Sequence, residues 1–120
     1  DEIAGLAMPG YTLHFGGMPA MDRDSAMGIF GMFFAALPDV RHEIVDLVAE
    51  GDRVAIRLHI TGTQHGELMG VPPSGKPVDF AAINILRLDG GKAAEQWINA
   101  DMLAGLQQIG AMPAPQAAAA

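Results

Sequence analysis

The spacing of hydrophobic residues along the chain changes from a helical to a strand-like period after Pro38. Before it, a helix is predicted over residues 24–37, because apolar residues recur every three or four positions: Ile29, Met32, Phe33, Ala36 and Leu37. Pro38 ends this helix, since the residue before a proline disfavours the helical conformation. Gly28 and Gly31 weaken it, and we interpret them as points where another element approaches closely.

After Pro38 the pattern predicts four strands, over residues 41–50, 53–61, 78–88 and 92–100. The second of them alternates most clearly, with its apolar side chains on one face: Val54, Ile56, Leu58 and Ile60. Two glycines after Asp89 predict a hairpin between the last two strands, because glycine supplies the positive φ that tight hairpins need. Consecutive strands joined in this way favour an α+β fold with a curved antiparallel sheet.

The two ends of the patterned region are shorter. Residues 1–7 are interpreted as the end of a helix, which the Pro-Gly pair at positions 9–10 breaks. Residues 11–15 are aromatic and β-prone, so they predict a short strand. A last helix is predicted over residues 101–109, with Gly110 as its stop.

The 120 residues suit a single domain over residues 1–112, followed by a disordered Pro- and Ala-rich tail over residues 113–120. Half of the residues are hydrophobic, which is enough for a packed core. The net charge of -7 and the scattering of seven basic residues argue against a nucleic-acid partner. No apolar run approaches the roughly 20 residues of a membrane span, so no membrane partner is expected. The absence of cysteine makes a reducing cytoplasm the plainer location.

The candidate chemistry is concentrated where the last strand runs into the last helix. Alternation places Trp97, Asn99 and Asp101 on one face, so that a large ring, an amide and a carboxylate would line one wall of a pocket. Asp101 has two interpretations. It is either the N-cap of the helix, or a general acid/base whose pKa is raised toward neutrality by burial beside Trp97.

The four histidines lack the close spacing of common metal motifs, and no metal site is predicted. His65 precedes a loop rich in glycine and proline, and is either a proton carrier or a loop residue bonded to the backbone. His14 could reach the mouth of a pocket. We expect His59 to form hydrogen bonds across the sheet and His42 to lie on the surface.

Five segments, in their order and spacing, resemble the SnoaL-like polyketide cyclases: residues 36–42, 50–57, 62–67, 70–78 and 97–110. The resemblance extends over about residues 11–110. It implies the nuclear transport factor 2-like fold, a cone-shaped α+β barrel around an apolar pocket, with a homodimer and neither metal nor cofactor. It also implies that Asp101, which matches the family's aspartate, is the acid/base of an intramolecular aldol ring closure.

The chain departs from the family pattern in two places. The fold normally begins with a long helix over the cone, and this chain starts near that helix's end, so a truncated first helix is expected. Ring-closing members also carry an amide and a histidine on the strand before the last. Asn84 matches the amide, but Leu86 stands at the histidine position, which puts that reaction in doubt.

Together these features predict a small-molecule enzyme that uses cofactor-free acid/base chemistry on an apolar, carbonyl-bearing, polyketide-like substrate. Asp101 would move the proton, with His65 as a second candidate. The residues expected to bind the substrate are Trp97, Asn84, Asn99, Phe80, Leu58, His14, Tyr11 and Met69. Two alternatives stay open: a non-catalytic protein that binds hydrophobic ligands in the same pocket, and a scaffold that acts through the outer face of the sheet.

Overall fold

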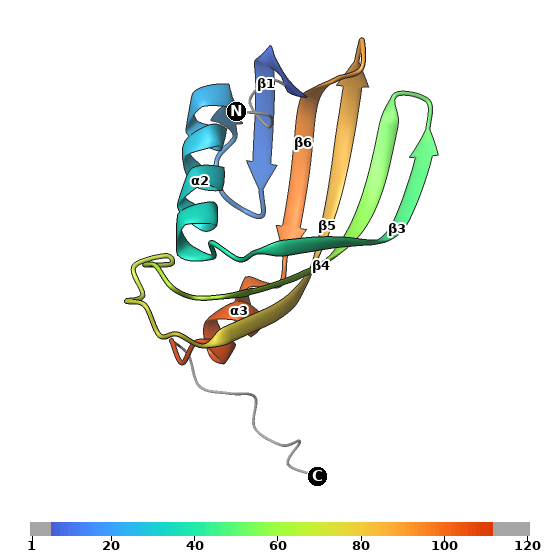
Figure 1. Ribbon diagram of the computed structural model, residues 1–120. Helices are drawn as coiled ribbons and strands as arrows, with labels where there is room; N and C mark the ends of the chain where they lie inside the picture. The colour runs from blue at the N-terminus through green and yellow to red at the C-terminus, as the bar shows by residue number, and fades with distance from the viewer. Residues whose placement is uncertain (1–5, 112–120) are drawn as a thin grey trace.

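A computed structural model describes residues 6–111 of the chain. It contains six strands and two helices, labelled as in Figure 1. In chain order the elements are β1 (Ala7–Phe15), β2 (Met21–Asp22), α2 (Arg23–Ala36), β3 (Arg41–Glu50), β4 (Arg53–Thr63), β5 (Pro77–Asp89), β6 (Lys92–Ala100) and α3 (Met102–Gln108). The predicted helices and strands after residue 20 are confirmed, with boundaries that differ by a few residues at most.

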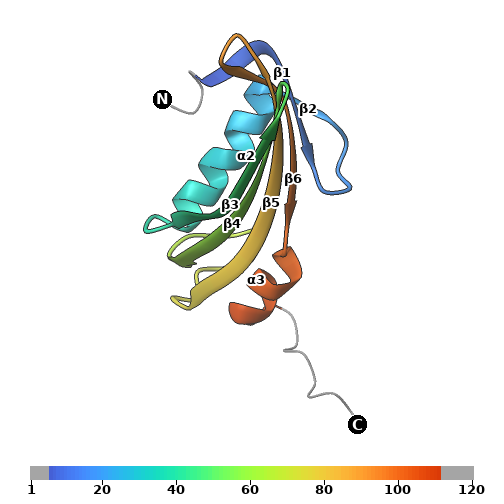
Figure 2. The same ribbon diagram turned by 90° about the vertical axis from the view of Figure 1, so that its right-hand side faces the viewer.

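The strands form one sheet in the order β2-β1-β6-β5-β4-β3. Strands β3 to β6 are antiparallel neighbours, as predicted, but β1 runs parallel to β6. The sheet is therefore mixed, and the prediction of a wholly antiparallel sheet is wrong. Among the described residues no pairing joins the edge strands β2 and β3, so the sheet is open and strongly curved rather than a closed barrel (Figure 2).

The start of the described chain also differs from the prediction. Strand β1 begins at Ala7 and continues through the Pro-Gly pair that we expected to break a helix. Its pairing with β6 shifts register between Ala7 and Thr12, and Pro9 lies within this irregular stretch. Proline is tolerated in a strand at such a place, because no ladder hydrogen bond is required of its nitrogen. The predicted helix over residues 1–7 falls mostly outside the described residues.

Helix α2 packs along one face of the sheet, which we call the inner face (Figures 1 and 2). Asp22 caps its N-terminus, with the carboxylate accepting a hydrogen bond of 2.8 Å from the Ser25 backbone. Two groups of buried side chains fill the inner side. One joins α2, the central strands and α3: Leu37, Leu58, Val78, Phe80 and Ile109. The other joins α2 to the β1 side of the sheet: Tyr11, Leu13, Ala26 and Ile98.

None of the helices described in residues 6–111 is long and apolar enough to cross a membrane.

The close approach expected at Gly28 and Gly31 is not found. A methyl group built on either glycine would meet no atom within 4 Å, so the space beside these positions is open. Among the described glycines, the closest approach of another segment is at Gly66, in the loop after β4. A methyl group there would lie 2.7 Å from the carbonyl oxygen of Ala35, near the C-terminal end of α2.

We expect Gly31→Ala to stabilise the protein by about 0.5–1 kcal/mol, because alanine restricts the unfolded chain and is a better helix former than glycine. The measurement is a urea unfolding curve monitored by circular dichroism. Gly66→Ala is the matched control of opposite sign, since its methyl group would press on backbone. A Gly31→Ala protein that unfolds at lower urea concentration than the parent would contradict the open space seen beside this residue.

Candidate functional site

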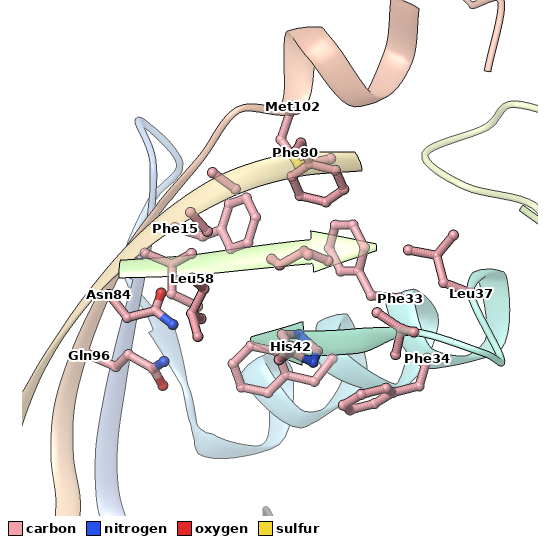
Figure 3. A pocket seen from close by; sticks show the side chains of 16 residues that line it. Phe15, Phe33, Phe34, Leu37, His42, Leu58, Phe80, Asn84, Gln96 and Met102 are labelled. Carbon is pink, nitrogen blue, oxygen red and sulfur yellow. The ribbon is translucent and has the colours of Figure 1, made fainter. Parts of the chain in front are cut away.

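A cavity of about 340 Å³ lies between the inner face of the sheet and α2 (Figure 3). The side chains that line it come from β1, from α2 and the segment that follows it, from the four strands β3 to β6, and from the start of α3. They are Phe15, Phe30, Phe33, Phe34, Leu37, Val40, His42, Leu58, Ile60, Phe80, Ala82, Asn84, Gln96, Ile98, Ala100 and Met102.

All five phenylalanines of the chain line this cavity. Helix α2 supplies three of them from one side, while Phe15 and Phe80 come from the sheet. The rings of Phe15 and Phe33 are nearly parallel, with centroids 6.0 Å apart and an interplanar angle of 17°. A cavity with such walls favours a flat, largely apolar ligand, because aromatic faces offer a large contact area for stacking.

The walls carry three polar side chains. Asn84 on β5 and Gln96 on β6 are diagonal neighbours, since Asn84 pairs with Ile98 and Gln96 pairs with Leu86. Figure 3 shows both carboxamides at one end of the cavity and His42 nearer to α2. The amide oxygen of Asn84 is buried and has no hydrogen-bond partner among the described residues. Buried polar atoms are almost always bonded, so an unpaired one in a cavity wall suggests a ligand or water partner.

Gln96 is held in place by Tyr11. The phenol of Tyr11 donates a hydrogen bond of 2.5 Å to Oε1 of Gln96, and its side chain is almost fully buried. Burial raises the pKa of Tyr11 to about 12, so the phenol keeps the proton that it donates. Tyr11 itself lines a smaller cavity of about 240 Å³ behind Gln96, together with Leu86, and not the main one.

Among the described residues 6–111, His42 is the only titratable side chain that lines the main cavity. It stands on β3 opposite Ile60, whose side chain is on the inner face. Its ring packs edge-to-face with that of Phe34, with the two ring centroids 6.3 Å apart. Partial burial lowers its pKa below the ordinary 6.5, because the charged imidazolium loses hydration. The sequence interpretation of His42 as a surface residue is confirmed, since the residue is exposed, but its place beside the cavity was not predicted. The hairpin turn at Gly51 could have predicted this place, because it sets the register between β3 and the clearly alternating β4 and so puts His42 opposite Ile60.

The predicted wall of Trp97, Asn99 and Asp101 does not face the cavity. Trp97 and Asn99 do share a face of β6, but it is the outer one, and the inner positions are taken by Ile98 and Ala100. Alternation was correct, and the choice of face was wrong. Trp97, which was predicted to line the pocket, instead contacts other side chains on the outer face.

Those side chains form a ladder across four strands. Trp97 stacks on the ring of His14 at 5.3 Å, and the guanidinium of Arg53 lies 5.1 Å from the centre of the indole. His14 also bonds Glu95 at 2.7 Å, and Arg87 bonds the other carboxylate oxygen at 3.3 Å. The hydrogen bond from His14, and then Arg87, lowers the pKa of Glu95. The substrate-binding role predicted for His14 has no support in this position.

Asp101 lies between two cavity residues, Ala100 and Met102, but its own side chain is exposed. Its Oδ1 accepts a hydrogen bond of 3.1 Å from the backbone of Ala104, so the N-cap interpretation is confirmed. The acid/base role of Asp101 stays a prediction.

Of the remaining predicted residues, Leu58, Phe80 and Asn84 are brought together in the cavity, while His65 and Met69 are not. His65 is exposed, and its backbone N–H donates to the carbonyl of Ala36 at 3.0 Å. Met69 is 48% exposed in the loop after β4.

Two further predictions have different outcomes. The predicted cross-sheet hydrogen bond of His59 is confirmed, with its Nε2 at 2.5 Å from the Asp79 carboxylate on β5. The homodimer stays a prediction. The outer face does expose apolar side chains that a second copy could cover, among them Val48 and Ile83.

The described residues form an α+β fold, with a mixed six-stranded sheet and two helices. The chain belongs to the SnoaL-like polyketide cyclase family, whose model matches residues 6–109. The resemblance seen in the sequence is thereby confirmed, and with it the nuclear transport factor 2-like fold. No curated protein matches the chain.

Solved structures give the same family at about 30% identity. AclR of Streptomyces galilaeus, described as a putative hydroxylase, is 30% identical with a TM-score of 0.85, over 92% of this chain and 83% of its own. A putative SnoaL-like polyketide cyclase of Jannaschia sp. CCS1 is 29% identical with a TM-score of 0.84, over 91% and 76%. IdmH of Streptomyces antibioticus, a putative polyketide cyclase, is 31% identical with a TM-score of 0.77, over 90% and 84%.

Proposed function

We propose that this protein binds a flat, carbonyl-bearing, polyketide-like compound in the cavity under α2 and catalyses proton transfer on it without a cofactor. The observation that carries the proposal is the composition of the cavity wall. Every phenylalanine of the chain lies there, together with two carboxamides and one histidine. Membership of the polyketide cyclase family supports the substrate class.

The chemistry follows from what these groups do at neutral pH. A histidine whose pKa is lowered is mostly neutral, so His42 can take a proton from the carbon next to a bound carbonyl group. The substrate becomes an enolate and His42 an imidazolium. The carboxamide of Gln96, whose oxygen is bonded to Tyr11, can donate a hydrogen bond to the enolate oxygen, which stabilises the developing charge. An enolate formed in this way is the nucleophile that an aldol ring closure needs.

Hydrogen–deuterium exchange of 2-tetralone tests the proposal without knowledge of the natural substrate. This bicyclic ketone is flat and apolar, and it carries exchangeable protons beside its carbonyl group. In D₂O at neutral pH, the protein is expected to accelerate the loss of these proton signals in NMR spectra at least about 100-fold over buffer at equal pD, the usual range for a positioned acid/base. An exchange rate equal to that in buffer, with the ketone shown to be bound, would contradict an acid/base function.

Binding of 2-tetralone without faster exchange would support the alternative function, a non-catalytic carrier of hydrophobic compounds. Two observations favour this alternative. No carboxylate of the described part of the chain lines the cavity, and Leu86 occupies the position at which ring-closing relatives are expected to carry a histidine. In that case 2-tetralone binds saturably and is released unchanged.

A further inference from the structure

The polar end of the main cavity has a defined hydrogen-bonding direction, and Tyr11 sets it. A carboxamide can rotate by 180° and exchange its oxygen and nitrogen at little cost when nothing holds it. Here the Tyr11 phenol donates to Oε1 of Gln96, and a phenol has only one hydrogen to donate. The oxygen of Gln96 is therefore held toward Tyr11, and its nitrogen is left with two N–H groups.

The two cavities show which way these N–H groups point. Gln96 lines both of them, whereas Tyr11 lines only the smaller one. The oxygen of Gln96 is therefore turned toward the side of the smaller cavity, and its NH₂ group toward the main one. Beside it, Asn84 contributes a buried amide oxygen that has no partner among the described residues. One N–H donor and one free acceptor thus stand on neighbouring strands in an otherwise apolar wall.

We propose that Tyr11 is a positioning residue for ligand selection: it holds Gln96 so that its amide N–H donates to an acceptor oxygen of the ligand, such as a carbonyl, while the Asn84 oxygen accepts from a neighbouring hydroxyl group. The preferred ligand is then a flat compound with a carbonyl oxygen and a hydroxyl close together, as in an enolised β-diketone or a hydroxyquinone. This inference rests on the proposed function, because it specifies the ligand of the same cavity. The high pKa of Tyr11 keeps the arrangement unchanged over the physiological pH range.

The test uses two probes of nearly equal shape, 2-acetylnaphthalene and 2-isopropenylnaphthalene. The first has C=O where the second has C=CH₂, so only the first can accept a hydrogen bond. Dissociation constants are measured by naphthalene fluorescence for the parent protein, Gln96→Met and Tyr11→Phe. The quantity compared is the ratio of the two affinities, because the different hydration of the probes cancels between variants.

Gln96→Met removes the donor and keeps the length of the side chain, so the ketone-to-alkene affinity ratio is expected to fall about tenfold, the upper range for one hydrogen bond. Tyr11→Phe leaves Gln96 in place but lets its amide rotate, and the ratio is expected to fall about threefold to fivefold. The affinity for the alkene should change less than about twofold in both variants, since a single lost hydrogen bond does not reshape the aromatic walls. If Tyr11 only supported the fold, both probes would weaken together and the ratio would stay constant.

A second probe pair tests Asn84. The affinity ratio of 2-naphthol to 2-methylnaphthalene is expected to fall about fivefold in Asn84→Leu, because the buried acceptor for the hydroxyl is lost. An unchanged ratio would overturn the role of Asn84.

The outcomes separate this inference from the proposal on which it rests. Tight binding of both naphthalenes with a ketone-to-alkene ratio that is the same in the parent and in Gln96→Met would overturn the inference and leave an apolar ligand pocket standing. Failure of the parent protein to bind any naphthalene probe would overturn the proposed function, and the inference with it.

Discussion

Replacing Gln64 with leucine is expected to lower the free energy of unfolding by about 3–4 kcal/mol, because it removes three hydrogen bonds between a buried side chain and the backbone of the loop after β4. Gln64 is the buried polar side chain of the described core, with 0% exposure. Its Nε2 donates to the carbonyls of Val71 and Pro72 at 3.0 and 3.1 Å, and its Oε1 accepts from the Ser74 backbone at 3.1 Å. One side chain therefore holds together the loop that follows β4.

The leucine substitution keeps the volume of the side chain and removes only the hydrogen bonds. Chemical unfolding by urea, followed by circular dichroism, measures the effect. Gln107→Leu is the matched control on the half-buried side of α3, where the same replacement is expected to change stability by less than about 0.5 kcal/mol. Equal stabilities for the parent and Gln64→Leu would show that the loop does not depend on this clamp.

The helices and strands could be predicted because their local patterns are strong. The alternation from Val54 to Ile60 and the hairpin glycines after Asp89 determine where β4, β5 and β6 begin and pair. The parallel pairing of β1 with β6 could not be predicted in this way. It joins residues about 80 positions apart, and no local period records which edge of a sheet a short N-terminal strand will occupy.

The candidate site shows the same division between period and face. Alternation correctly predicted that Trp97 and Asn99 share one side of β6, but a period of two is equally consistent with either side facing α2. The inner face of β6 is the one that continues the inner faces of its neighbours, and Leu58 on β4 and Phe80 on β5 were correctly predicted to face the cavity. The pairing of β3 with β4 then places His42 on the inner face as well.

Removal of His42 is expected to have a large effect on proton exchange. His42→Phe is expected to reduce the protein-catalysed exchange of 2-tetralone at least about 100-fold, since it removes the one titratable group of the cavity wall and keeps a ring of similar size. Asp101→Asn should leave the rate within about threefold, because asparagine caps a helix as well as aspartate does. Binding of 2-tetralone, measured separately by NMR titration, should persist in both variants.

The pH dependence provides an independent check on the same residue. A base acts only in its neutral form, so the enzyme-catalysed rate should rise with pH through the pKa of His42 and stay constant above it. Because partial burial in the aromatic cavity lowers that pKa, the midpoint is expected below pH 6.5. The opposite pattern, with exchange abolished in Asp101→Asn and retained in His42→Phe, would show that Asp101 and not His42 is the acid/base. It would also mean that Asp101 gives up its bond to the Ala104 backbone and turns inward when a ligand is bound.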